Sequence, residues 1–177
     1  MGKVLAQIGA KVGRSPKVNV GFLAGAKYQA TVHKPKQGGL PVAQVAFWDE
    51  FGTVHSPPRP FFRAMISQNS PHWPAQLGKA LKVTHMDGPR ALELMGDKMK
   101  RELQDSIRQG SFTPLSPTTL VLRKWQDDDH SLVVIRTTVR KAAAAAKRGE
   151  PGAVGDRARP LQDQLVMVNA VDYEVKP

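Results

Sequence analysis

The clearest pattern of apolar and polar positions lies in the middle of the chain, where it predicts a long amphipathic helix near residues 89–109. Apolar residues recur there at helical spacing, and charged residues occupy the opposite face. The apolar positions are Leu92, Met95, Met99, Leu103 and Ile107. Pro89 suits the first turn of a helix and Gly110 its end, so both boundaries of the element are marked.

Shorter helices are predicted from apolar spacing, N-terminal prolines and alanine content. They cover residues 3–12, 41–52, 60–66, 74–81, 117–124, 141–147 and 161–165. Ser116 is placed to cap the helix that begins at Pro117. The alanine run at 141–147 is alternatively a low-complexity spacer.

Strands are predicted by alternation over 17–22 and by β-branched residues over 131–139 and 166–175. The intervals 25–40 and 140–159 contain glycine and proline and are predicted as mobile loops, and Asp127–Asp129 is predicted as a further loop. The first interval is alternatively a hairpin whose sides include Tyr28 and Val32. These elements predict a single α+β domain over residues 1–177. A small, mainly antiparallel sheet is packed by helices.

The composition of the chain excludes several kinds of functional site. The chain has 177 residues, a net charge of +11 and no cysteine, which excludes disulfides, cysteine-ligated zinc, iron–sulfur clusters and thiol catalysis. No apolar run has the length of a membrane span, and the N-terminus does not resemble a secretory signal, so we expect a basic intracellular protein.

The positive charge is concentrated in two segments, one before Asp49 and one after residue 135. Candidate docking or DNA-facing residues are Lys27, Lys34, Lys36, Arg140, Lys141, Lys147 and Arg148. The alternative is that they are solvated surface residues that maintain solubility. The second segment has no aromatic residue between its cations, so it lacks platforms on which bases could stack.

No residue constellation supports catalysis, a metal site or a cofactor. The histidines are not paired at ligand spacing, and the adjacent Asp49 and Glu50 are a poor acid–base pair because neighbouring helical residues point in different directions. We therefore expect no enzyme activity. A hydrolase or nuclease that uses Asp49, Glu50 and a histidine is the competing hypothesis.

The most distinctive segment is a predicted helix end followed by a proline-rich corner. Its structural signature comprises Glu50, Phe51, Gly52, Pro58, Arg59, Pro60 and Phe61. We expect an ion pair between Glu50 and Arg59 to fix the corner, with Phe51, Phe61 and Phe62 filling the core below it. The alternative is that Arg59 is an ordinary surface residue whose pairing matters little.

This signature resembles the neck and tail-completion proteins of long-tailed bacteriophages, which include head–tail joining proteins and minor tail components. Three further stretches resemble the family in the same order along the chain: 20–28, 114–120 and 160–163. The sequence departs from the family at Gln164, where a Thr-Gly pair is expected, and in the long interval 126–159.

The resemblance implies a structural virion protein without catalytic activity or cofactor. Such proteins assemble in the host cytoplasm into rings, typically hexamers, around the DNA channel of the virion neck. They complete the tail and join it to the head. The implied partners are further copies of the chain, the head–tail connector and tail-terminator or tail-tube proteins, with genome DNA as a further candidate, but no membrane. The alternatives are a tail-terminator ring protein and, from the charge alone, a basic nucleic-acid-binding module.

Overall fold

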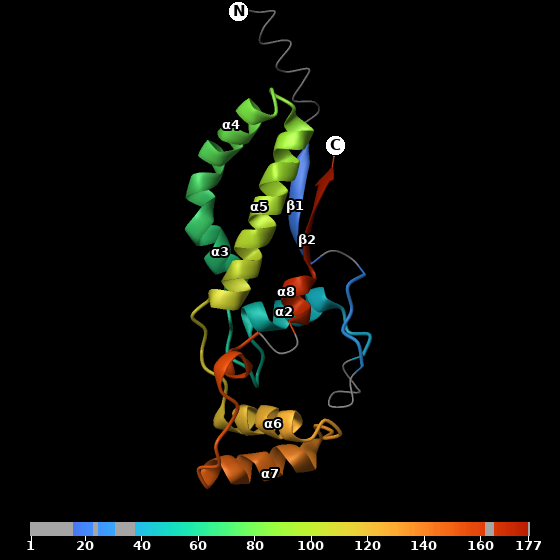
Figure 1. Cartoon of the computed structure of the whole chain (residues 1–177), viewed down its shortest axis with the longest axis vertical. Coiled ribbons are helices and arrows are strands. Elements are labelled where there is room, and N and C mark those ends of the chain that lie inside the picture. Colours follow the sequence, from blue (N-terminus) through green and yellow to red (C-terminus); the bar gives the residue numbers. More distant parts are fainter. Residues whose placement is uncertain (1–15, 23–24, 31–37, 162–164, 177) are drawn as a thin grey trace, which may run out of the picture. The chain divides into compact units, whose positions relative to one another are not determined.

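A computed structural model of the chain describes residues 16–22, 25–30, 38–161 and 165–176 (Figure 1). These residues belong to two compact units, each assembled from segments that are distant in sequence. The first unit comprises 1–24, 60–110 and 169–177, and the second comprises 25–59 and 111–168. The helix predicted at 3–12 lies outside the described residues, and the single domain stays a prediction.

The first unit contains a two-stranded antiparallel sheet. Strand β1 (Lys17–Phe22) pairs with β2 (Val171–Lys176), with Val18 opposite Val175 and Val20 opposite Tyr173. The first predicted strand is confirmed with its boundaries. Together with the helices, this sheet confirms the predicted α+β class.

Helices α3 (Phe61–Asn69), α4 (Trp73–Val83) and α5 (Gly88–Gln109) complete the first unit, with a short 3₁₀ turn, η2 (Ser70–His72), between α3 and α4. Helix α5 packs against both strands and against α3 and α4 (Figure 1). The largest fully buried side chains of the unit are Phe61, Met65, Leu103, Ile107 and Val171.

Helix α5 is the predicted amphipathic helix, and its start is set by a side-chain cap. The Asp87 carboxylate accepts a hydrogen bond from the Arg90 amide at 3.1 Å, and Pro89 follows within the first turn. Two polar contacts connect α5 with α3 and with the start of α4. The Ser106 hydroxyl donates to the Phe61 carbonyl at 2.7 Å, and the Trp73 indole donates to Glu102 at 2.9 Å.

Gly96 allows α5 to approach the sheet closely. A Cβ atom at this buried position would lie 2.3 Å from the ring of Tyr173 on β2. Since real Cβ atoms do not approach carbon this closely, a side chain at residue 96 would displace either the helix or the tyrosine.

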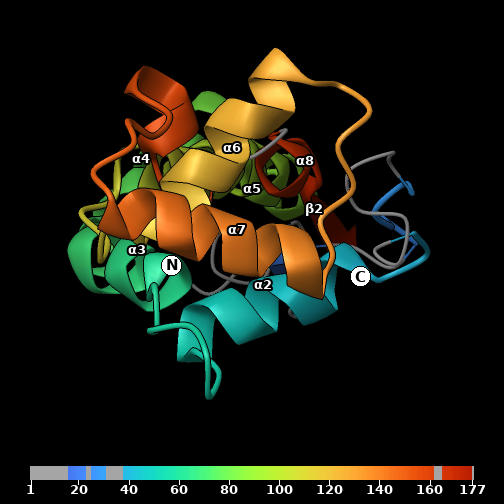
Figure 2. The same cartoon turned by 90° about the horizontal axis from the view of Figure 1, so that it is seen from below.

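The second unit contains α2 (Val42–Phe51), α6 (Pro117–Asp128), α7 (Arg136–Lys147) and the short elements η3 (Gly155–Ala158) and α8 (Val166–Asn169). Helices α6 and α7 lie side by side (Figures 1 and 2). Val121 packs against Ala142 and Ala145 between them. The predicted cap of α6 is confirmed, because the Ser116 hydroxyl accepts from the Thr119 amide at 3.2 Å.

The strand predicted at 131–139 is wrong. The segment is irregular up to Ile135, and α7 begins at Arg136. The Thr138 hydroxyl accepts a hydrogen bond from the Ile135 amide at 2.9 Å, and the alanines that follow pack on α6. Helix capping and packing on α6 therefore outweigh the β-propensity of this segment.

Three further boundaries differ from the predictions. Asp127 and Asp128 belong to α6, so the loop predicted there is wrong, and Lys124 forms an i,i+4 ion pair with Asp128. Residues 140–147 belong to α7, so only the rest of the interval 140–159 is a connection. The last strand begins at Val171 because α8 occupies its expected start. Most of the predicted helix at 161–165 lies outside the described residues.

The connection after α7 is attached to α6. The Ala153 amide donates to the Leu120 carbonyl at 2.9 Å, and the Trp125 indole donates to Glu150 at 2.6 Å. The predicted mobility of this connection and of residues 25–40 stays a prediction.

We predict that Gly96→Ala destabilises the protein by about 1–3 kcal/mol, because the added methyl overpacks the contact with Tyr173. Gly78→Ala is the matched control, since it lies in α4 and a Cβ there meets nothing within 4 Å. This control should stabilise the helix by about 0.5–1 kcal/mol. Thermal unfolding of both variants tests the prediction, and equal shifts would contradict it.

Candidate interaction surface

Helix α2 departs from an ordinary surface helix in one buried acidic residue and in the aromatic residues that it exposes. Its buried positions are Val42, Ala46 and Glu50, of which Glu50 retains only 5% exposure. The exposed face carries Phe47 at 60% and Phe51 at 54% exposure. An acidic residue is therefore inside while two phenylalanines face solvent, which is the reverse of the usual distribution.

The exposed apolar side chains form one stripe. The rings of Phe47 and Phe51 contact each other with centroids 4.7 Å apart, and Trp48 lies on the same side of the helix at 39% exposure. Val54, in the turn after the helix, is 96% exposed. We refer to Phe47, Trp48, Phe51 and Val54 as the aromatic surface. Contiguous exposed apolar groups of this kind mark interaction sites.

The turn after α2 requires glycine at its first position. Gly52 has φ of 80°, and a Cβ there would lie 2.9 Å from the Pro58 nitrogen. A tight turn follows, in which the Thr53 amide donates to the Ser56 carbonyl at 2.9 Å. The Thr53 hydroxyl accepts from the amides of His55 and Ser56 at 3.2 and 3.1 Å. Residues 51–58 line a shallow hollow around this turn.

Arg59 fixes the far end of the corner through two contacts with one residue. Its backbone amide donates to the Asp49 carbonyl at 2.7 Å, and its guanidinium contacts the Asp49 carboxylate at 3.0 Å. Arg59 is buried, at 9% exposure, so it is not an ordinary surface residue. The corner is therefore closed onto the last turn of α2.

Two details of the predicted corner are wrong. The carboxylate that Arg59 contacts belongs to Asp49, not Glu50, because α2 turns Glu50 onto its buried face. Phe51 is exposed and does not fill the core, whereas Phe61 is buried in the first unit, as expected. Phe62 is half-buried. Adjacent helical residues point in directions about 100° apart, so a shift of one residue exchanges the two environments.

The electrostatics of Asp49 combine two opposing effects. Burial raises the pKa of its carboxyl above the ordinary value, and the Arg59 guanidinium offsets only part of this shift. The ionised carboxylate therefore costs stability despite its ion pair, since the loss of water around it outweighs the attraction.

The basic candidates occupy two places. Lys27 is exposed and its backbone pairs with Pro41 ahead of α2, whereas Lys34 and Lys36 lie outside the described residues. Arg140, Lys141 and Lys147 are exposed on α7, and Arg148 is its C-cap. The second group thus shares one helix. No contact among the described residues connects these cations of α7 with the structural signature at the end of α2.

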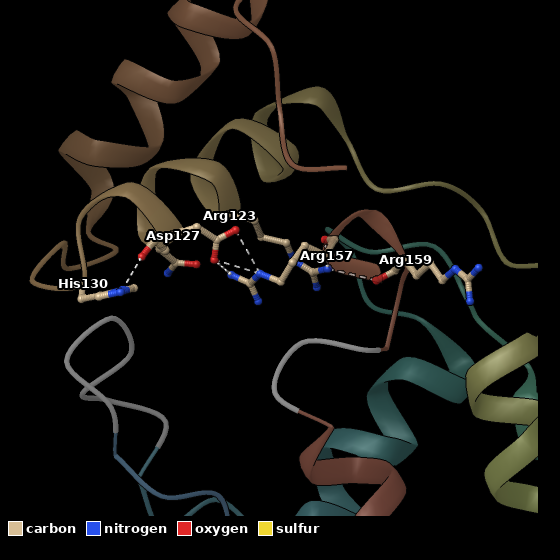
Figure 3. A network of polar contacts seen from close by, with 6 residues as sticks. Arg123, Asp127, His130, Arg157 and Arg159 are labelled. Atoms are coloured by element: carbon tan, nitrogen blue, oxygen red, sulfur yellow. Dashed lines mark hydrogen bonds and ion pairs between the residues drawn. The ribbon is translucent and has the colours of Figure 1, made fainter. Parts of the chain in front are cut away.

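Sequence reasoning missed a polar network between α6 and the segment that follows α7 (Figure 3). The buried Arg123 guanidinium donates to the carbonyls of Arg157 and Arg159 at 2.6 and 2.9 Å. The Arg157 guanidinium in turn contacts Asp127 at 3.0 Å, and the His130 ring lies 3.2 Å from the Gln126 carbonyl. No local sequence pattern indicates this network, because Arg123 follows the buried Val121 by two residues and therefore lies on a different side of α6. The network attaches a connection to a helix, and its role is structural.

The described residues contain no group of three or more His, Cys, Asp or Glu side chains that could hold a metal ion. Asp49 is paired with Arg59, and Glu50 is buried. Comparisons with protein-family models, curated proteins and solved structures found no match. No helix in the described part of the chain is long and apolar enough to cross a membrane.

We predict that Arg59→Ala destabilises the protein by about 1–3 kcal/mol, because it leaves the partly buried Asp49 carboxylate without this partner. Arg90→Ala, at an exposed position on α5, is the control and should stay within about 0.5 kcal/mol of the parent. Chemical denaturation measures both. A parent-like midpoint for Arg59→Ala would show that the corner does not depend on this contact.

The raised pKa of Asp49 predicts a pH dependence with a defined sign. The folded state binds the proton more tightly than the unfolded state, so Asp49 contributes most stability below its ordinary pKa of 3.8, and this contribution is lost as the pH rises through the folded-state pKa. The parent should therefore gain stability relative to Asp49→Asn as the pH falls from 7 to about 4. Melting temperatures of the two proteins across this range test the sign, and a relative loss would contradict it.

Proposed function

We propose that this chain is a structural subunit of a phage virion neck, in which several copies form a ring that completes the tail and joins it to the head around the DNA channel. The proposal assigns it no catalytic activity and no cofactor. It would assemble in the host cytoplasm and reside at the head-proximal end of the tail.

The observation that carries the proposal is the aromatic surface of α2. Fully burying a Phe side chain is worth about 1.5–3 kcal/mol, so leaving two of them in water sacrifices stability that the monomer could otherwise gain. An interface that buries the surface recovers this energy. Aromatic side chains are also the residues that dominate the energetics of protein interfaces.

A second copy of the chain is the occupant that a ring requires. In a closed ring, each subunit presents one face to the neighbour on one side and a different face to the neighbour on the other. Each subunit then needs only one face that is complementary to the aromatic surface of its neighbour. All copies bury it when the ring closes.

The corner supports this role because it fixes the shape of the surface. The double contact between Arg59 and Asp49 holds the segment after α2, and Gly52 permits the turn that presents Val54 beside Phe51. A surface held in this way loses little conformational entropy when it is buried. The sequence resemblance to neck and tail-completion proteins includes this same segment.

We predict that Phe47→Ser combined with Phe51→Ser prevents ring formation and leaves the monomer folded. The parent should form a discrete closed oligomer whose population rises with protein concentration in analytical ultracentrifugation. The double variant should remain monomeric at the same concentrations. Val83→Ser combined with Leu94→Ser is the control, because both residues are exposed apolar positions on α4 and α5 of the first unit.

Two results would reject the proposal. One is a double variant that assembles as the parent does. The other is the production of intact, infectious virions by a phage from which the coding sequence has been deleted, since loss of a neck protein should leave separate heads and tails.

A further inference from the structure

Helix α7 carries positive charge without compensation. Its cations are Arg136, Arg140, Lys141 and Lys147, followed by Arg148 at the C-cap, and the segment contains no acidic residue. All five side chains are exposed, and none forms an ion pair within the described part of the chain. We call these five residues the cationic face.

Three of the five cations lie on the side of α7 away from α6. Ala142 and Ala145, which are fully buried, pack against Val121 of α6. At about 3.6 residues per turn, Arg136, Arg140 and Lys147 lie on the side of α7 opposite these alanines, whereas Lys141 and Arg148 lie beside them. Figure 2 shows α7 beside α6, and the two helices are in contact.

Acidic residues near the hairpin are engaged elsewhere. On α6, Asp127 contacts Arg157 at 3.0 Å and Asp128 pairs with Lys124. Asp129 accepts hydrogen bonds from Ser131. Glu150 accepts the Trp125 indole proton at 2.6 Å, and Asp156 lies 3.5 Å from Arg159. The contacts of these five acids therefore do not neutralise α7, although two of them follow it closely in sequence.

The positions of two cations on α7 lower the stability of this helix. Arg136 stands at the helix N-terminus, where the helix dipole disfavours a cation, and Arg140 follows it at the i,i+4 distance, where like charges repel. Neither interaction is needed for the packing of Ala142 and Ala145. An external polyanion would relieve both.

We infer that the cationic face binds the phosphate backbone of duplex nucleic acid without reading its sequence. A duplex carries one phosphate for about every 1.7 Å of its axis, so several phosphates lie within the roughly 17 Å that α7 spans. The remaining exposed side chains include Thr137, Val139 and Ala144, none of which can recognise a base by paired hydrogen bonds. Contacts would thus be to phosphates alone.

The composition of the face favours a duplex over other anionic partners. Helices that lie on membranes carry Trp, Phe or Leu anchors, and protein interfaces depend on buried aromatic anchors. Between its cations α7 offers only small side chains and the partly exposed Val139. Single strands are disfavoured because base stacking requires aromatic residues, which α7 lacks.

The experiment compares two variants of the full chain in which the net charge falls by the same amount. Arg140→Gln, Lys141→Gln and Lys147→Gln are combined in the α7 variant. Lys79→Gln, Lys82→Gln and Arg90→Gln, all exposed in the first unit, are combined in the control. Each set replaces one arginine and two lysines. Binding of a fluorescent duplex of about two helical turns is measured by anisotropy as a function of salt concentration, with circular dichroism to confirm folding.

We expect the parent and the control to bind alike, with an affinity that falls steeply as salt increases. The α7 variant should bind at least about tenfold more weakly, and its slope of log affinity against log salt should be shallower by up to about 2.7, or about 0.9 for each phosphate that the variant no longer neutralises. Equal weakening by the control, or no binding by the parent, overturns the inference. If polyglutamate of equal charge displaces the duplex as well as unlabelled duplex does, the face binds acidic protein instead and the inference is overturned.

This inference does not rest on the proposed ring. The combined Phe47→Ser and Phe51→Ser variant keeps the cationic face and should still bind duplex with the salt dependence of a monomer. The α7 variant should keep the oligomeric state of the parent. Failure of one proposal is therefore distinguishable from failure of the other.

Discussion

The corner after α2 depends on the two contacts between Arg59 and Asp49. The backbone contact fixes where the chain returns to the helix, and the ion pair fills the space beside it with a buried guanidinium. Between these residues the chain has room only for a tight turn, and Gly52 supplies the backbone geometry that starts it. Phe51 and Val54 both line the hollow around this turn. The corner thus places Val54, whereas the other residues of the aromatic surface are placed by α2 itself.

Several features of α2 and of this corner lower the stability of an isolated monomer. Burial raises the pKa of Asp49, so its ionised form is costly at neutral pH, while α2 exposes phenylalanines and buries Glu50. Each arrangement would be improved, for a monomer, by a simple substitution. Proteins tend to retain such costs where a surface serves binding, because binding supplies the compensating energy elsewhere.

The sequence predicts those elements whose signals are local. The apolar stripe and flanking signals of α5, the Ser116 cap of α6 and the alternation of β1 each depend on a few neighbouring residues, and the structure confirms them. Where distant packing decides, prediction fails. Residues 131–139 have strand propensity, yet the alanines that follow pack on α6 and Thr138 caps the helix. The motif marks Arg59 as important but predicts a partner one residue away from the observed one, because spacing alone does not tell which of two adjacent carboxylates faces the corner.

The second unit carries two surfaces whose chemistry responds oppositely to ionic strength. Burial of the aromatic surface releases water from apolar groups, a contribution that added salt does not screen and that excluded salts such as sulfate strengthen. The proposed contact of the cationic face with a duplex would act through charge, and salt would weaken it by competing for the phosphates. A protein that used one surface for both purposes would have to compromise between them. Because the apolar side chains lie on α2 and the cations on α7, the proposed association between copies and the proposed attraction to a polyanion could each be changed by mutation without changing the other.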